Sequence, residues 1–428
     1  MLVGSAVRRV AIVGGVRIPF ARAHTAYAAV GNAEMLTAVL RGMVERFSLH
    51  GERLGDVAAG AVIKHPGDYN LTRESVLSSG LDPHTPGLGL QRACGTSLEA
   101  AVAVGNKIAL GQIEVGIAAG VDTISDPPVS YPRNYQQLLL ASHRGRTFAQ
   151  RLAPWLRVRP GHFRPVFPQV VEPRTGLSMG ESTELMARRW RISRQAQDQL
   201  AYESHMKAAQ AWREGFYADL VEPHLGLVSD NNVRPDTSLE KLAKLRASFD
   251  PRDGTLTAGN STPLTDGASA VLLASAQWAQ RRKLPVLAYL TYGKVWAVDF
   301  ASGREGLLMA PAYAVPAMLR DAQLTLQDFD YYEIHEAFAA QVLCTLAAWE
   351  SESFCRESLG LAASLGAIDR TRLNVKGGSV AIGHPFAATG TRILATLAKL
   401  LATDSTARRG LVSVCTAGGM GVTAIVER

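Results

Sequence analysis

Short apolar runs alternate along the chain with stretches in which apolar residues recur at helical spacing. Residues 10–15 form a β-branched run that ends in glycine, and residues 88–90 form another run before an alanine-rich segment that begins at Ser97. The runs predict buried strands, and the spacing predicts helices over 32–47 and from Ser97 onward. Strands and helices that alternate in this way are typical of α/β proteins with a layered sheet.

The second half of the chain repeats this outline. The pattern predicts a strand at 286–295, a helix over 313–320, and then, twice, a strand, a turn and a helix, across 331–343 and across 373–401. The chain closes on a further run of β-branched residues.

A short phrase, Thr-Ala-Gly, occurs once in each half, beginning at Thr257 and at Thr416. Cys94 precedes Thr257 by 163 residues, whereas His384 precedes Thr416 by 32. Two copies of one α/β unit, the first interrupted by an insertion, account for this difference. The layout predicts three parts: a first half at 1–127 and 250–281, an inserted subdomain at 128–249, and a second half at 282–428.

The insertion differs from the two halves in its amino-acid composition. Between positions 131 and 174 there are eight arginines, no lysine and a single acid, Glu172, with leucine and aromatic residues between the arginines. The prolines of this stretch predict an absence of regular structure. Further on, Ser193 is expected to cap a long helix over 194–214 that ends at Gly215.

Composition limits the class of protein. The chain has 428 residues, of which 47% are hydrophobic and 19% charged, with a net charge of +7; this fits a globular protein of two or three domains. Its four cysteines show no metal-ligand spacing, so we expect reduced thiols and no bound metal. No apolar run approaches the ~20 residues of a membrane span, and the stretch before the first strand is short for a leader, so we expect a cytoplasmic protein.

Four reactive side chains fall at glycine turns between predicted strands and helices, and these are Cys94, His335, His384 and Cys415. A thiol at a helix N-terminus lies where free N–H groups favour the thiolate, so Cys94 is a candidate nucleophile. Each residue alone also has an ordinary interpretation, because most cysteines are small buried hydrophobes and most histidines are satisfied core or surface groups.

Together the four motifs resemble those of the thiolase family. CGTS holds Cys94, HEAFA holds His335, GHPFAATG holds His384 and CTAGGMG holds Cys415, and the resemblance extends from Val10 to the C-terminus. HEAFA has histidine where many short-chain thiolases have asparagine, which is similar to the long-chain subgroup that includes the β-subunit of the trifunctional fatty-acid oxidation complex. The resemblance implies a five-layered α-β-α-β-α fold with mixed sheets in two duplicated halves.

The resemblance also implies a reaction, the cleavage of a 3-ketoacyl-CoA by CoA through an acyl-cysteine. Cys94 would be the nucleophile, His384 its base, Cys415 the acid, and His335 with His384 the donors to an enolate oxygen. The backbone N–H groups of Cys94 and Ala417 would bind the acyl-cysteine oxygen. CoA would be a co-substrate, with no permanent cofactor. The residues expected to bind the substrate or CoA are Ser178, Met179, Arg234, Leu245, Phe249, Ala258, Thr262 and Phe338.

Alternative functions stay open at this point. A biosynthetic acetoacetyl-CoA thiolase has the same motifs, a condensing ketoacyl synthase lacks the second cysteine, and a silent scaffold subunit would not need the intact set of four. The resemblance implies a homodimer or homotetramer, with a hydratase/dehydrogenase α-subunit as a further partner. The arginine-rich insertion suits an anionic membrane surface, a partner subunit or plain solvent; nucleic acid is discounted because no nucleic-acid-binding module is present.

Overall fold

The strands form one ten-stranded sheet whose two halves have the same order. The computed structural model describes residues 7–428, and the sheet runs β4-β3-β5-β6-β1-β7-β10-β9-β8, with β2 paired to β6 alone. The strands are β1 Val10–Arg17, β2 Ala21–Arg22, β3 Asp56–Ala59, β4 Gly87–Gly89, β5 Val115–Asp122, β6 Thr265–Ser275, β7 Ala288–Ala297, β8 Tyr331–Ile334, β9 Arg409–Thr416 and β10 Met420–Glu427.

The direction of the strands confirms the duplication. In the first half β3 and β5 are parallel, and β6 and β1 follow antiparallel; in the second half β8 and β9 are parallel, and β10 and β7 follow antiparallel. The two halves join where Val10, Ala11 and Ile12 of β1 pair with β7.

The counterpart of β4 is reduced to a single bridge between Tyr332 and Leu373. The strand expected near Leu373 is therefore absent. Asn374 has a φ of 45°, and its side chain accepts from the Ile334 N–H and donates to the Ile334 carbonyl, both at 2.9 Å. An amide side chain thus takes the hydrogen bonds that a continued strand would make.

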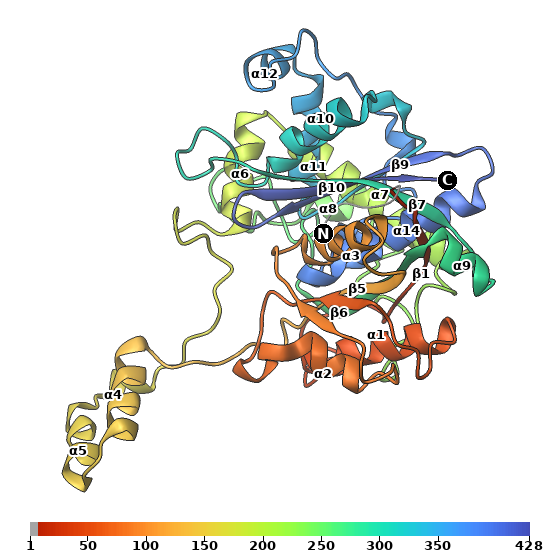
Figure 1. Ribbon diagram of the computed structural model, residues 1–428. Coiled ribbons are helices and arrows are strands. Elements are labelled where there is room, and N and C mark those ends of the chain that lie inside the picture. Colours follow the sequence, from red (N-terminus) through yellow and green to blue (C-terminus); the bar gives the residue numbers. More distant parts are fainter. Residues whose placement is uncertain (1–6) are drawn as a thin grey trace.

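The helices complete five layers, as Figure 1 shows from α10 and α11 above to α1 and α2 below. The helices α1 (Asn32–Arg46) and α2 (Leu71–Leu77) cover the outer face of the first half, and α10 (Ala310–Ala322) and α11 (Ala339–Glu350) cover that of the second. The helices α3 (Thr96–Ala109) and α14 (Thr389–Thr403) pack together between the halves. The predicted α-β-α-β-α architecture is confirmed.

Burial on both faces explains the unbroken apolar strands. In β6, Val271 and Leu273 face the central helices, while Ala270 and Leu272 face α1 and α2, because successive side chains of a strand point to opposite faces. The edge strand β4 differs: Leu88 is 38% exposed, since β4 has one neighbouring strand. The prediction that 88–90 is buried is wrong for this residue.

The remaining helices belong to the insertion or to connections: α4 Arg133–Arg144, α5 Phe148–Leu152, α6 Met179–Arg189, α7 Arg194–Arg213, α8 Leu239–Ala243, α9 Ala276–Arg281, α12 Glu352–Glu357 and α13 Ser379–Ile382. The predicted long helix is confirmed as α7, with the Ser193 hydroxyl accepting from the Ala196 N–H and Gly215 at a φ of 71° after its end. No helix within residues 7–428 combines the length and apolar character needed to cross a bilayer.

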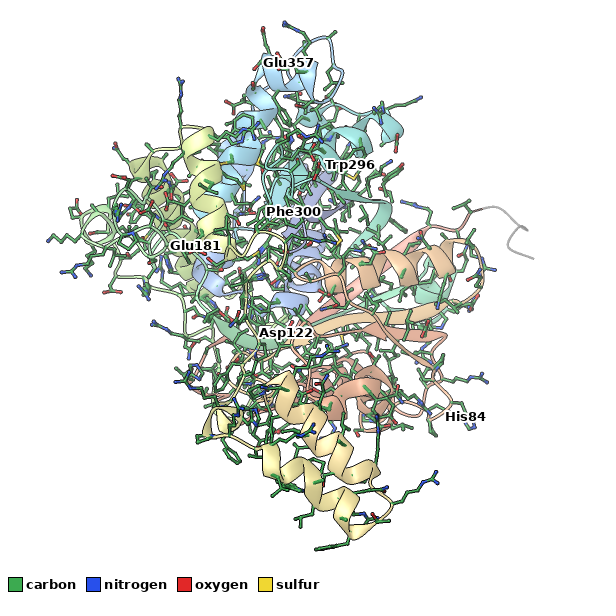
Figure 2. The ribbon with its side chains drawn as sticks, turned by 90° about the vertical axis from the view of Figure 1, so that its left-hand side faces the viewer. His84, Asp122, Glu181, Trp296, Phe300 and Glu357 are labelled. Atoms are coloured by element: carbon green, nitrogen blue, oxygen red, sulfur yellow. The ribbon has the colours of Figure 1, made fainter. Side chains whose placement is uncertain are left out.

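Residues 129–170, here called the arm, project from the body of the protein and carry α4 and α5 (Figure 1), which face the viewer in Figure 2. At its base Ser130 and Val166 exchange backbone hydrogen bonds of 2.9 and 2.8 Å. The prediction that prolines exclude regular structure here is wrong, because Pro132 caps the N-terminus of α4, where a missing N–H costs nothing.

Candidate active site

The turn that carries Cys94 is tightly constrained. Ala93 has a φ of 44°, an uncommon conformation for a residue with a side chain. The Thr96 hydroxyl supports it by accepting from the Arg92 N–H at 2.9 Å and donating to the Ala93 carbonyl at 2.7 Å. A Cβ on Gly95 would lie 2.8 Å from Val422 Cγ2, so only glycine fits between the turn and β10. Cys94 is thereby held just before the first turn of α3.

The turn that carries His384 is equally specific. Gly383 has a φ of 110°, and a Cβ there would lie 2.7 Å from Asn232 Nδ2 and 2.8 Å from the side chain of Thr265. The Asn232 amide donates to the Ile382 carbonyl at 3.1 Å. The His384 ring is 4% exposed, and its Nδ1 lies 2.6 Å from the Thr389 hydroxyl at the start of α14.

The two turns meet because the N-termini of α3 and α14 meet. The Ser97 hydroxyl accepts from the Thr391 N–H at 2.9 Å. Asp122, at the end of β5 and labelled in Figure 2, is fully buried and accepts from the Ala387 N–H at 2.7 Å and from the N–H groups of Val62 and Ile63. Asp122 was not among the candidate residues, although a buried strand that ends in an acid is a usable signal. It fixes the loop after His384 to the first half.

His335 follows β8 and lies beside His384, with the ring centroids 4.1 Å apart. Its Nδ1 is 2.8 Å from the Ser379 hydroxyl, and the ring is 1% exposed. Its Nε2 is buried and has no hydrogen-bond partner among the described residues. A buried N–H or lone pair without a partner is costly, and this nitrogen is therefore free to bind a water molecule or a ligand group.

Cys415 and Ala417 come from the β9–β10 hairpin. The backbone N–H groups of Ala417 and of Cys94 itself face the Cys94 sulfur and act to lower its pKa. Burial raises the pKa of Cys415, and a negative charge on Cys94 raises it further. Cys94, Cys415 and the Ala417 N–H are therefore brought together, as His335 and His384 are, near the junction of the α3 and α14 N-termini. Glu172, the single acid of the arginine-rich stretch, accepts from the Gly418 N–H at 2.6 Å and so holds this hairpin.

Burial dominates the electrostatics of the site. It raises the pKa of the Cys94 thiol to about 12, more than the facing N–H groups lower it, and lowers the pKa of His384 to about 3. The pKa of His335 lies well below its usual value because of burial and the nearby charges of His384 and Arg392. The N–H groups therefore favour the thiolate, as expected at a helix N-terminus, but burial sets the net direction of the Cys94 pKa. The resting site holds a neutral thiol and a neutral imidazole, which makes a base essential.

Three of the predicted substrate-binding residues belong to, or pack against, the apolar cluster that contains Cys415. Phe249 and Phe338 meet edge to face with centroids 5.7 Å apart, and Met179 packs against the same apolar cluster as Cys415. The Thr262 hydroxyl donates to the Ala337 carbonyl at 3.1 Å, two residues after His335.

The other four lie further toward the surface. Leu245 packs under the Thr-Ala-Gly turn at Gly259, and Ala258 and Arg234 are exposed. The Ser178 hydroxyl caps α6, accepting from the Glu181 N–H at 3.2 Å. Their contacts with CoA stay predictions.

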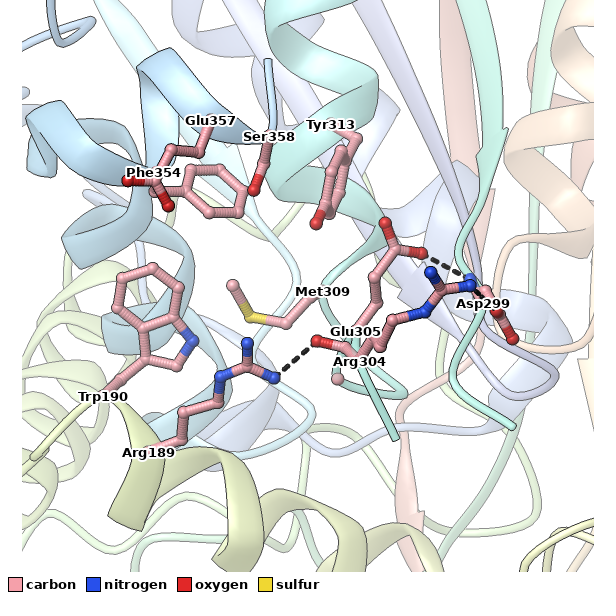
Figure 3. A pocket seen from close by; sticks show the side chains of 11 residues that line it. Arg189, Trp190, Asp299, Arg304, Glu305, Met309, Tyr313, Phe354, Glu357 and Ser358 are labelled. Atoms are coloured by element: carbon pink, nitrogen blue, oxygen red, sulfur yellow. Dashed lines mark hydrogen bonds and ion pairs between the residues drawn. The ribbon is translucent and has the colours of Figure 1, made fainter. Parts of the chain in front are cut away.

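Residues 7–428 contain no group of three or more His, Cys, Asp or Glu side chains arranged to hold a metal ion. A separate cavity of about 520 Å³ lies between α6, α10 and α12 and contains none of the four reactive residues (Figure 3). There Arg189 donates to the Arg304 carbonyl, beside the ring of Trp190.

A duplicated α/β sheet with a cysteine and a histidine at the N-termini of its two central helices defines a class of enzymes that use a cysteine nucleophile. The chain belongs to the thiolase family: the thiolase N-terminal domain matches residues 10–277, and the thiolase C-terminal domain matches residues 286–428.

Individual relatives agree with this assignment. The chain is 40% identical to a 3-ketoacyl-CoA thiolase of Yersinia enterocolitica, covering 98% of this chain and 97% of that protein, and 41% identical to one of Pectobacterium carotovorum, covering 98% and 96%. Among solved structures, the acetyl-CoA acetyltransferase of Bacillus anthracis has a TM-score of 0.81 at 28% identity, covering 99% of this chain and 100% of that one. Human mitochondrial 3-ketoacyl-CoA thiolase has a TM-score of 0.81 at 26% identity, with the same coverage.

Proposed function

We propose that the protein cleaves 3-ketoacyl-CoA with CoA, giving acetyl-CoA and an acyl-CoA shortened by two carbons, as in fatty-acid β-oxidation. The observation that carries this proposal is the pairing of two cysteines and two histidines: a charge on Cys94 raises the pKa of Cys415, and the His335 and His384 rings lie with centroids 4.1 Å apart. Similarity to 3-ketoacyl-CoA thiolases over nearly the whole chain supports it.

The reaction begins at Cys94. Neutral His384 takes the thiol proton as the sulfur attacks the 3-keto carbon, which a thiol with a pKa of about 12 cannot do unaided near neutral pH. The Cα–Cβ bond then breaks, with acetyl-CoA leaving as its enolate and the shortened acyl group remaining on Cys94. His335 and His384 donate hydrogen bonds to the enolate oxygen, and each such donor contributes roughly 3 to 4 kcal/mol to transition-state stabilisation.

Cys415 completes the cycle. Its thiol gives a proton to the enolate carbon, and the resulting thiolate then takes the proton of an incoming CoA thiol. That CoA attacks the acyl-Cys94 carbonyl, whose oxygen is held by the backbone N–H groups of Cys94 and Ala417, and the shortened acyl-CoA leaves. A condensing ketoacyl synthase has no need for such a second thiol, so Cys415 favours thiolysis.

The direct test measures acetyl-CoA formed from a chain-length series of 3-ketoacyl-CoA substrates plus CoA, together with the mass of Cys94-containing peptides after a rapid quench. We expect acyl adducts on Cys94, and higher kcat/KM for longer chains than for acetoacetyl-CoA. A preference for acetoacetyl-CoA would favour a biosynthetic acetoacetyl-CoA thiolase. The absence of both cleavage and adduct would reject the enzyme assignment in favour of a scaffold.

The Cys415→Ser variant separates the two halves of the cycle. We expect it to lose cleavage of 3-ketoacyl-CoA while Cys94 still accepts an acetyl group from acetyl-CoA, because acylation of Cys94 by transfer does not require a carbon acid. Cleavage at the wild-type rate would remove the acid role from Cys415.

We propose in addition that the protein is a homo-oligomer and that the arm contacts an anionic membrane surface. Between positions 131 and 164 the arm has seven arginines and no acid. Phe148 and Leu156 are 80% and 84% exposed on it, and Trp155 and Leu140 are also exposed. Apolar side chains among cations suit the headgroup region of a bilayer, where both kinds of side chain find a partner.

Sedimentation with vesicles tests the arm. We expect wild-type protein to sediment with phosphatidylserine vesicles and less with neutral ones, and the double variant Phe148→Glu/Leu156→Glu to stay in solution. Leu225→Glu, an exposed leucine away from the arm, is the control. Equal sedimentation of all variants would reject the membrane proposal, and the arm would then be examined as the docking site for a hydratase/dehydrogenase subunit.

A further inference from the structure

The Ser379 hydroxyl lies between two buried groups, the guanidinium of Arg392 and the imidazole of His335. Arg392 Nη2 donates to Ser379 Oγ at 2.7 Å, and His335 Nδ1 lies 2.8 Å from the same oxygen. Ser379, His335 and Arg392 are all at most 2% exposed. A single buried hydroxyl group therefore links the positive charge of Arg392, on α14, to the His335 ring.

The chemistry of the three groups sets the direction of each hydrogen bond. A guanidinium has only donors, so Ser379 Oγ accepts from Arg392. The remaining hydroxyl hydrogen has one acceptor within reach among the described residues, His335 Nδ1, because no other hydrogen bond of Ser379 Oγ is present there. Leaving that hydrogen unpaired in the interior costs about 1 to 3 kcal/mol. His335 Nδ1 therefore carries no hydrogen.

We infer that Ser379 and Arg392 are positioning residues that fix the tautomer of His335 with its hydrogen on Nε2. His335 is then a permanent hydrogen-bond donor to the enolate oxygen and takes no part in proton transfer. This inference rests on the proposed thiolysis for its role in catalysis, but the tautomer itself is a property of the resting protein. Arg392 and Ser379 act through His335 and do not touch the substrate.

The environment of His335 agrees with a fixed neutral donor. Its Nε2, the nitrogen assigned the hydrogen, is the buried atom left without a partner, and it belongs to the ring beside His384. A second proton would have to enter at Nδ1, which requires the Ser379 hydroxyl to turn away while Arg392 still donates to its oxygen. The neighbouring guanidinium also repels a charged imidazole. His384 has a different partner, Thr389, and has no such cation on its hydroxyl among the hydrogen bonds of the described residues.

The tautomer is measured on the resting protein labelled with ¹⁵N-histidine, with the His335 signals assigned from their loss in His335→Gln. We expect Nε2 in the protonated range and Nδ1 in the unprotonated range, unchanged from pH 8 to pH 5.5. A protonated Nδ1 would overturn the inference. Because this measurement needs no substrate, its outcome is independent of whether the protein proves to be a thiolase.

Kinetics separate a donor from an acid or base. In His335→Gln, whose amide donates a hydrogen bond but does not titrate, we expect kcat within about tenfold of wild type and an unchanged pH profile; in His335→Leu we expect a loss of 10²- to 10³-fold. A glutamine variant as inactive as the leucine variant would overturn the donor role.

In Ser379→Ala we expect a five- to tenfold lower kcat, an unchanged KM and an Nδ1 signal shifted toward the protonated range. An unshifted signal there would remove Ser379 from the inference.

Discussion

The rings of His335 and His384 lie with their centroids 4.1 Å apart. Among the described residues, no carboxylate hydrogen-bonds to either ring. Their Nδ1 atoms contact hydroxyl groups instead, of Ser379 and Thr389. Without a carboxylate partner, burial lowers the pKa of both imidazoles, that of His384 to about 3. The site therefore holds two neutral imidazoles across the physiological range, one available as a base.

The low pKa of His384 predicts an unusual pH dependence for Cys94. A base works in its unprotonated form, which is lost only as the pH falls toward about 3, so iodoacetamide should modify wild-type Cys94 at a nearly constant rate from pH 8 to pH 5. In His384→Ala the thiol must ionise from a pKa of about 12. We expect modification at pH 7 to slow by 10²- to 10⁴-fold and to rise about tenfold per pH unit.

Mass spectrometry of Cys94 peptides over a time course provides these rates. His84→Ala, which changes an exposed histidine, is the control and should match wild type. A wild-type rate that falls with a midpoint near pH 6.5 would mean that His384 titrates normally and that burial does not control the site.

Gly383→Ala is expected to displace His384. The new Cβ would meet Asn232 and Thr265 below 3.0 Å, and the φ of 110° is unfavourable for alanine. We expect a loss of about 1 to 3 kcal/mol in the free energy of unfolding and of about 10²-fold in kcat, since a shift of about 1 Å in a catalytic group has that effect. Urea denaturation and steady-state kinetics measure both. In the control Gly360→Ala, where φ is 66° with open space around the Cβ, kcat should stay unchanged.

Glu172 links the insertion to the hairpin of Cys415 and Ala417. Glu172 is 7% exposed, and its carboxylate accepts a hydrogen bond from the Gly418 N–H. Gly418 and Gly419 both have positive φ values. In Glu172→Ala we expect a loss of about 1.5 to 3 kcal/mol in the free energy of unfolding, because a hydrogen bond to a charged acceptor is lost, with a lower kcat as the Ala417 N–H shifts. Glu172→Gln, which keeps an acceptor, should recover most of both. If the alanine variant behaves like Glu74→Gln, a change at an exposed acid, the hairpin does not depend on Glu172.

The fold could be predicted from the sequence because strands that are buried on both faces appear as unbroken apolar runs, and helices appear as apolar residues at helical spacing. The run at 10–15 that became β1 and the capped helix α7 were predicted from such local signals. The strand near Leu373 and the helices of the arm were predicted wrongly. Near Leu373, the side chain of Asn374 makes the hydrogen bonds that a strand would make. In the arm, Pro132 stands at the beginning of a helix, and a proline in a sequence is equally compatible with the start of a helix and with its interruption.

The reactive residues were visible from the sequence because each has distinctive chemistry at a glycine turn. The groups that hold them were not visible, because their contacts are distant in sequence: Asp122 reaches Ala387, Glu172 reaches Gly418, and Ser97 reaches Thr391. For Cys94, the sequence indicated the N–H groups that lower the thiol pKa but not the burial that raises it. A helix N-terminus lowers a thiol pKa only by a modest amount, whereas burial raises that of Cys94 by more, and burial cannot be read from a local pattern.

Arg17 and Asp230 form the ion pair that fastens the insertion to β1. Both side chains are at most 4% exposed, and they are joined by two hydrogen bonds of 2.6 and 2.7 Å, while Asp230 also accepts from the Phe20 N–H at 2.8 Å. In Asp230→Ala we expect the free energy of unfolding to fall by about 3 to 5 kcal/mol, because Arg17 stays buried without its counter-charge. Asp236→Ala, which breaks an exposed pair with Lys241, should change it by less than about 1 kcal/mol. Urea denaturation of both variants decides the matter: equal, small effects would mean that Arg17 finds water or another acceptor and that the pair does not anchor the insertion.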